Sequence, residues 1–162
     1  MQSLPVLLAA CLVMPCAKDS TFAQAHTTEA KSSVTTSTLK AFLAAFNAHD
    51  LDAIMGFFAE DCEFYMPRGT DAWGTRYVGK SAVREGLATR FAGIPDVHYG
   101  DDNHWVAGNL GISTWLLTGT TLTGEQIRVR GVDLLEFRDG KIVKKDSYWK
   151  IVQKQESRPT AR

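Results

Sequence analysis

Two strands joined by a tight turn are predicted by Gly131-Val132-Asp133-Leu134-Leu135-Glu136-Phe137-Arg138-Asp139-Gly140-Lys141-Ile142-Val143, which continues to Tyr148-Trp149. Apolar and polar residues alternate on both sides of Asp139-Gly140, a dipeptide typical of two-residue hairpin turns. Counting by twos places Asp133 on one strand face with the apolar residues Val129, Leu135 and Phe137. A carboxylate among such neighbours is either buried and held by hydrogen bonds or lines a cavity.

The rest of the chain predicts an α+β domain. Turn signals separate four long strands, over residues 97–107, 111–122, 126–138 and 141–152. The first half shows helical spacing over residues 38–48, then a helix over 51–58 capped by Asp50, and a third helix capped by Ser81. A strand at 60–66 and a polar loop at 68–76 lie between them. We therefore expect a cone-shaped, curved antiparallel sheet wrapped around three N-terminal helices.

The two ends differ in composition from the predicted domain, residues 38–153. Residues 1–25 contain a short apolar run and Ala23-Gln24-Ala25, as in a signal peptide, although no basic residue precedes the run. A lipoprotein box ending at Cys11 and an unstructured leader are the alternatives. We expect export to the periplasm or medium, a cytoplasmic location if the leader is not a signal, and no membrane span. Residues 26–37 read as a flexible linker and residues 154–162 as a disordered tail.

Composition excludes several classes of protein. Of the 162 residues, 44% are hydrophobic and 22% charged, which is typical of one globular domain. Eighteen basic residues balance eighteen acidic ones, which argues against a nucleic-acid partner. The leader holds two of the three cysteines, so Cys62 alone would remain after cleavage, as a buried apolar residue without a disulfide. No phosphate loop, nucleophile elbow or zinc-binding cysteine pair is present, and we predict neither metal nor cofactor.

An ordered set of short motifs resembles the SnoaL-like branch of the nuclear transport factor two and ketosteroid isomerase superfamily. The motifs are residues 46–54 (FNAHDLDAI), 58–62 (FAEDC), 79–84 (GKSAVR), 137–142 (FRDGKI) and 148–149 (YW). The resemblance covers residues 38–152 and implies the cone-shaped, cystatin-like roll. It leaves the activity open, since this fold carries isomerases, cyclases, dehydratases, epoxide hydrolases and non-enzymes.

Of the three positions that are functional in ketosteroid isomerases, only one has a matching residue in this sequence. Asp133 matches the inward acid that donates to an oxyanion in ketosteroid isomerases and moves protons in polyketide cyclases. Met66 stands where the isomerase base would be, and Phe42 stands where its tyrosine would be. Neither side chain can exchange a proton, so we do not expect the isomerase mechanism in its familiar form.

Three residues are the candidates for chemistry. Asp133 is the principal acid or base, because burial or pairing would tune its proton affinity. Lys145 shares a strand face with Ser147 and Trp149 and could reach Asp133. His98 and His104 are six residues apart, hence on one face of a regular strand, and His104 is the better partner for Asp133 because it adjoins Trp105. The alternative reading is a buried Asp133 held by serine, threonine or tryptophan donors, with no chemistry.

A pocket for a small apolar molecule is expected inside the cone. Its predicted lining is Phe42, Phe64, Met66, Trp73, Trp105, Trp115, Val129 and Trp149, with Trp73 on a loop that could act as a lid. Two hypotheses follow: an enzyme doing cofactor-free isomerisation, cyclisation or dehydration, or a non-catalytic ligand-binding or dimerising domain. Val132, Leu134 and Tyr148 point to the opposite sheet face, where a homodimer would cover them.

Overall fold

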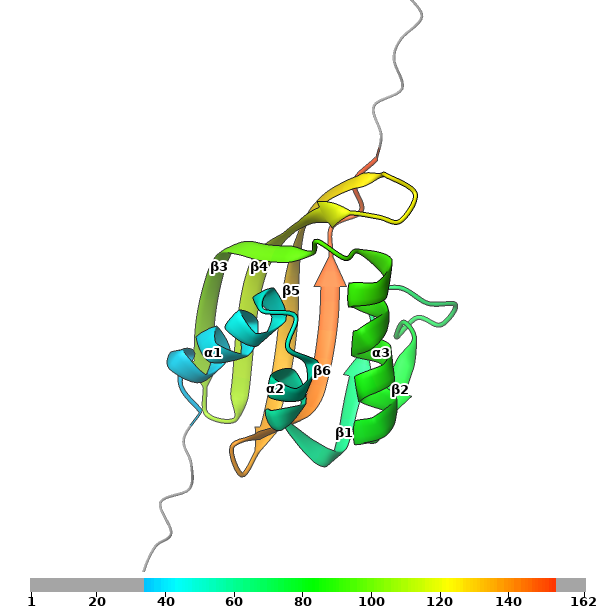
Figure 1. The fold of residues 1–162 in the computed structure, drawn as a ribbon. Helices are drawn as coiled ribbons and strands as arrows, with labels where there is room; N and C mark the ends of the chain where they lie inside the picture. Colours follow the sequence, from blue (N-terminus) through cyan, green and yellow to red (C-terminus); the bar gives the residue numbers. More distant parts are fainter. Residues whose placement is uncertain (1–33, 154–162) are drawn as a thin grey trace, which may run out of the picture.

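The computed structural model describes residues 34–153, and the predicted leader, most of the predicted linker and the predicted tail lie outside them. Its elements are α1 (Thr36–Asn47), α2 (Leu51–Gly56), β1 (Phe58–Tyr65), β2 (Arg76–Val78), α3 (Lys80–Gly93), β3 (His98–Ala107), β4 (Leu110–Thr120), β5 (Gln126–Arg138) and β6 (Lys141–Trp149). The strands form one sheet in the order β2-β1-β6-β5-β4-β3. This sheet curves around the helices, which all lie on its concave side (Figure 1). The predicted α+β cone is confirmed.

Local sequence explains where the first helices begin. Thr35 and Thr38 form a reciprocal capping box, so α1 begins at Thr36, inside the segment predicted as linker. Asp50 caps α2 as predicted, by accepting a hydrogen bond from the Ala53 amide at 2.9 Å. The predicted cap of α3 is wrong: Gly79 occupies that position at φ 86, and Ser81 lies inside the helix. Only glycine adopts this φ without strain, which explains the earlier start.

The hairpin that the sequence placed at Asp139-Gly140 is present. These two residues have φ 52 and φ 74 and connect β5 directly to β6. Positive φ at both central residues is the mark of a type I′ turn, which matches the twist of the flanking strands. The turn pairs Arg138 with Lys141, and a bulge between Glu136 and Phe137 then shifts the register by one residue, so that Asp133 lies opposite Ser147.

One strand pair departs from the expected antiparallel sheet. β6 lies between β5 and β1, and it pairs with β1 in parallel, with Phe64 opposite Lys145. A parallel pair needs a long connection, which here is the whole chain from α3 to β5. The first and last strands thus meet at the centre of the sheet and bring Lys145 beside the aromatic residues of β1.

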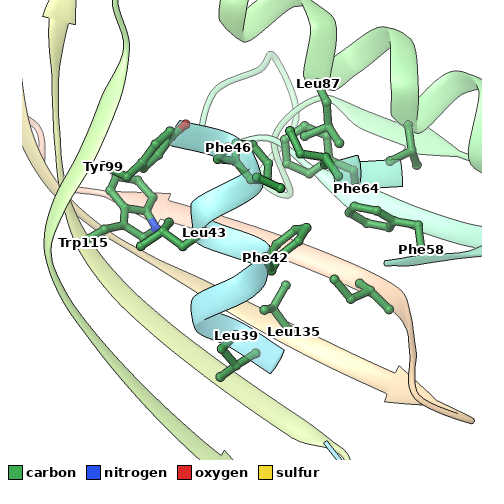
Figure 2. Close-up of a cluster of buried hydrophobic side chains, with 14 of the residues drawn as sticks. Leu39, Phe42, Leu43, Phe46, Phe58, Phe64, Leu87, Tyr99, Trp115 and Leu135 are labelled. Carbon is green, nitrogen blue, oxygen red and sulfur yellow. The ribbon is translucent and has the colours of Figure 1, made fainter. Parts of the chain in front are cut away.

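The hydrophobic core fills the space between the helices and the concave sheet face. Four residues of α1 point toward the sheet at helical spacing, Leu39, Phe42, Leu43 and Phe46 (Figure 2). The Phe42 ring meets the rings of Phe46, Phe57 and Phe58 edge to face, at centroid distances of 5.1–5.7 Å. The sheet contributes buried residues such as Trp115, Leu117, Leu135 and Ile142. Four polar side chains lie buried among them, Ser113, Asp133, Lys145 and Ser147.

Candidate functional site

Strand register places the buried polar residues in a row across the concave face. His104 of β3 lies opposite Ser113 of β4, Ser113 opposite Asp133 of β5, and Asp133 opposite Ser147 of β6. Lys145 precedes Ser147 by two residues and therefore shares its face. Four neighbouring strands thus present polar groups to one region under α1.

Asp133 is held by three donors. Its side chain is 8% exposed, and Oδ1 accepts hydrogen bonds from Lys145 Nζ at 2.5 Å and from Ser147 Oγ at 2.7 Å. Oδ2 accepts one from Trp115 Nε1 at 3.1 Å. Of the ways in which a buried acid can be accommodated, the structure shows ion pairing together with hydrogen bonding. Each carboxylate oxygen has two acceptor sites, so Oδ2 keeps one site open.

Lys145 is as deeply buried as its partner. Its side chain is 5% exposed, and Nζ lies 5.1 Å from the ring centroid of Phe64 and 5.8 Å from that of Phe46. Burial lowers the pKa of Lys145 from its usual value, and the charge of Asp133 opposes that shift. Nζ donates to Asp133 and to Ser147, which leaves one of the three ammonium donors for another acceptor. The contact between Lys145 and Asp133 that strand parity predicted is confirmed.

His104 forms hydrogen bonds with Ser113 and Asp102 and none with Asp133. Its Nδ1 lies 2.8 Å from Ser113 Oγ, and its Nε2 lies 2.8 Å from Asp102 Oδ2. The His104 side chain is buried, whereas that of Asp102 is partly exposed. The structure therefore forms a polar chain from the outer strand β3 to Ser113, which lines the same cavity as Asp133.

A bulge in β3 decides which histidine faces inward. The register shifts between Gly100 and Asn103, and Asp101 has φ 47. His98 is consequently exposed while His104 points inward, so the expectation that the two share a face is wrong. The same bulge turns Trp105 outward, where it is 53% exposed rather than lining the pocket.

A small cavity lies beside Asp133, and we call it the central cavity. Its lining is Phe42, Leu43, Phe46, Phe64, Met66, Pro67, Gly86, Leu87, Arg90, Tyr99, Ser113, Trp115, Asp133, Lys145 and Ser147. The open space at its centre is about 20 Å³, roughly enough for one water molecule. Only Met66, Pro67 and Arg90 of the lining are partly exposed, and they mark its mouth. A larger molecule enters only if flexible side chains such as Met66 and Arg90 move.

The predicted lining is present in part. Phe42, Phe64, Met66 and Trp115 line the central cavity. Trp73 does not, because its loop turns outward around Asp71 and leaves the indole 62% exposed. Val129 is buried in the core but does not line the central cavity. Trp149 does not line it either, and the guanidinium groups of Arg68 and Arg90 stack on its ring. Sequence reasoning missed Arg90, which comes from a helix with no local signal of a site.

Gly131 allows the indole that binds Asp133 to lie flat against the sheet. It lies opposite Trp115, and a Cβ at this position would be 2.2 Å from the Trp115 ring. We expect Gly131→Ala to lower the free energy of unfolding by about 1–3 kcal/mol, because the ring must shift. Urea denaturation measures this. Gly93→Ala is the control, because its Cβ would meet nothing within 4 Å; equal destabilisation of both variants would contradict the packing argument.

Comparison with known proteins agrees with this architecture. The SnoaL-like domain model matches residues 39–145. The chain belongs to the SnoaL-like domain family. No protein among the curated sequences is significantly similar to it.

Solved structures similar to this SnoaL-like domain share its fold at low sequence identity. A proposed polyketide cyclase from Xanthomonas campestris pv. campestris is 22% identical over 71% of this chain and 89% of that chain, with a TM-score of 0.64. A proposed isomerase from Bacillus subtilis is 22% identical over 71% and 85%, with a TM-score of 0.61. A protein of ketosteroid isomerase-like fold from Catenulispora acidiphila DSM 44928, solved with trimethylamine, is 22% identical over 71% and 86%, with a TM-score of 0.62.

Two further findings concern metals and membranes. Within residues 34–153 no three histidine, cysteine, aspartate or glutamate side chains come together as a metal site. The helices of the same region are all too short or too polar to cross a bilayer.

Proposed function

We propose that this SnoaL-like domain is a small-molecule enzyme whose first step removes a proton from a carbon next to a carbonyl group. Isomerisation, cyclisation and dehydration can all begin with that step, and none of them needs a cofactor. The observation that carries the proposal is the buried pair of Asp133 and Lys145 on the wall of a cavity. Burying two charges costs several kcal/mol per ion and contributes little net stability, so a functional role is the better explanation of the pair.

Asp133 is the proposed base. Its Oδ1 is occupied by Lys145 and Ser147, whereas Oδ2 has only Trp115 as a donor and keeps one acceptor site. A substrate carbon placed beside Oδ2 could therefore transfer its proton there. The three donors hold the carboxylate in one orientation, which lowers the entropic cost of reaching the reactive geometry.

Lys145 is the proposed stabiliser of the negative charge that forms on the substrate oxygen. Its ammonium has one donor left after Asp133 and Ser147, and it lies in an apolar, water-poor place where such a donor is effective. His104 has no contact with Asp133. We assign it a relay role, in which Ser113 and Asp102 connect the cavity to solvent.

A second function is favoured by a specific observation. The central cavity has an open space of only about 20 Å³, and the polar atoms that surround it already have partners. A non-catalytic domain that binds a ligand or only dimerises would have these features too. The two functions differ in one measurable property, which is proton transfer that depends on Asp133.

Deuterium exchange tests the proposal without a known substrate. Cyclic enones and β-keto esters would be incubated with the protein in D₂O, and incorporation next to the carbonyl would be followed by NMR. An enzyme accelerates exchange into at least one compound, and the Asp133→Asn variant does not. If no compound exchanges faster with the protein than without it, while the same compounds bind, the binding function is the correct one.

We also propose a homodimer through the convex face of the sheet. Ile112, Leu134 and Tyr148 are exposed there on three adjacent strands, although they are large and apolar or aromatic. We expect sedimentation equilibrium to give the mass of two chains, and Leu134→Arg to give that of one. Leu122→Arg is the control, because Leu122 is exposed in the loop between β4 and β5. A monomeric wild type, or a dimeric Leu134→Arg variant, would contradict this interface.

A further inference from the structure

The residues around the central cavity carry more positive than negative charge. Lys145 and Arg90 line it together with a single acid, Asp133, which is paired with Lys145. Arg68 and Arg90 both stack on Trp149, with each guanidinium group 4.7 Å from the centroid of the ring. Among residues 34–153, neither arginine has a carboxylate within the 4.0 Å that defines an ion pair.

The arginines at the mouth are oriented by the indole. A guanidinium that stacks on an aromatic ring uses its flat face and leaves its in-plane N–H groups free. Those groups form the fork that binds a carboxylate through two parallel hydrogen bonds. The neighbouring Tyr99 hydroxyl interacts with the Arg90 guanidinium and occupies one of its N–H groups, but the others remain. Burial raises the pKa of Tyr99, so the phenol stays uncharged and does not neutralise the arginine.

We propose that the ligand of the central cavity is a small carboxylate with an apolar body, whose carboxylate group is bound by Arg90, the arginine of the lining. The inference rests on the proposed function and names the substrate class for the same site. The negative charge of the ligand would balance the positive charge of Arg90, which is the cation left over once Lys145 is paired with Asp133. The apolar body then extends inward between Phe46 and Phe64, and its far end reaches the open acceptor site of Asp133 Oδ2.

The positions of Arg90 and Asp133 set the orientation of the substrate in the central cavity. Arg90 is partly exposed and marks the mouth, whereas Asp133 is buried and lies at the inner wall. A carboxylate held at the mouth keeps its hydration in part, so binding does not require a third buried charge. The reacting carbon would therefore lie away from the carboxylate, at the apolar end of the molecule.

Binding of three six-carbon probes tests this inference. Hexanoate, 1-hexanol and hexylamine would be titrated into the full chain, with the indole signals of Trp149 and Trp115 followed by NMR. We expect hexanoate to bind most tightly and hexylamine least. Arg90→Met should weaken hexanoate binding by about 10- to 100-fold and leave 1-hexanol nearly unchanged, since it removes charged hydrogen bonds and keeps an apolar stem.

Two further variants make the test specific. Arg84→Met is the control, because Arg84 is on the same helix but its guanidinium pairs with Asp52 at the surface. Arg90→Lys keeps the charge without the planar fork and should give an intermediate loss. The inference is overturned if 1-hexanol binds as tightly as hexanoate, if Arg90→Met changes neither, or if hexanoate shows no saturable binding. A thermal denaturation curve for each variant checks that it is folded.

Hexanoate binding and deuterium exchange test the carboxylate ligand and the proposed catalysis separately. If hexanoate binds through Arg90 but no compound exchanges its protons, the proposed catalysis is wrong and the ligand class stands. If Asp133-dependent exchange is found while hexanoate is bound no better than 1-hexanol, the enzyme stands and the carboxylate does not.

Discussion

Replacing Asp133 with asparagine is expected to slow deuterium exchange in the best substrate by about 10²- to 10⁴-fold, the usual contribution of a positioned general base. The amide has nearly the same shape as the carboxylate and can still accept a hydrogen bond from Lys145. It cannot take up a proton from carbon near neutral pH, so the chemical step is lost. It also removes the counter-charge of Lys145, so a thermal denaturation curve is needed to check that the variant is folded. Initial rates of exchange in D₂O, followed by NMR, measure the effect.

The matched control for this variant is Asp146→Asn. Asp146 is next to Lys145 on β6 but points to the other face, where it accepts a hydrogen bond from the Tyr148 hydroxyl at 2.9 Å. Its exchange rate should equal that of the wild type. Binding of an unreactive ligand should also be retained by Asp133→Asn. A variant that loses binding and exchange in the same proportion would show that Asp133 holds the ligand and does not catalyse.

The second large effect concerns the stability of the buried pair. We expect Asp133→Leu to lower the free energy of unfolding by about 3–5 kcal/mol, because it leaves the Lys145 ammonium buried without its counter-charge. Lys145→Met should be similarly harmful, since it leaves a buried carboxylate with two neutral donors. The double variant Asp133→Leu/Lys145→Met removes both charges and should recover most of the loss. Urea unfolding of all four proteins completes the double-mutant cycle.

The pH dependence of the Asp133→Leu variant gives an independent check. Burial already lowers the pKa of Lys145, and without Asp133 nothing nearby opposes that shift as strongly. Between this lowered pKa and the ordinary value of about 10.4, the unfolded chain binds a proton that the folded chain does not. The free energy of unfolding of Asp133→Leu should therefore rise with pH in that window, relative to the double variant. Parallel pH curves for the two proteins would show that Lys145 escapes to solvent instead.

Much of the fold follows from local patterns. The strand pair on either side of Asp139-Gly140 was predicted with its exact bounds for β5, because the turn signal and the alternation both mark where that strand ends. The cap at Asp50 was likewise local, since its side chain bonds to an amide three residues away. The inward position of Asp133 follows from parity counted along β5. That of Lys145 also depends on the bulge in the β5–β6 pair, since Ile142 and Lys145 are both buried although they are three residues apart.

The errors have physical causes of a different kind. His98, His104 and Trp105 were counted along β3 as if the strand were regular, and a bulge at Asp101 reverses the count. The position of Trp73 depends on how a turn at Asp71 directs its loop, which no periodicity records. The parallel pairing of β1 with β6 joins the two ends of the domain, so no pattern within either strand predicts it.

The sequence by itself determined that Asp133 faces inward, because buried and exposed residues alternate along β5. It also made Lys145 a candidate partner, but the register that brings the two together depends on a bulge in the β5–β6 pair between Glu136 and Phe137. Only the tertiary structure decided what surrounds that pair. Arg90 from α3 and Arg68 from the loop after β1 both stack on Trp149 of β6, and Ser113 joins His104 to the cavity wall. These contacts link residues that are far apart in the chain, and their positions depend on the curvature of the whole sheet rather than on any local period.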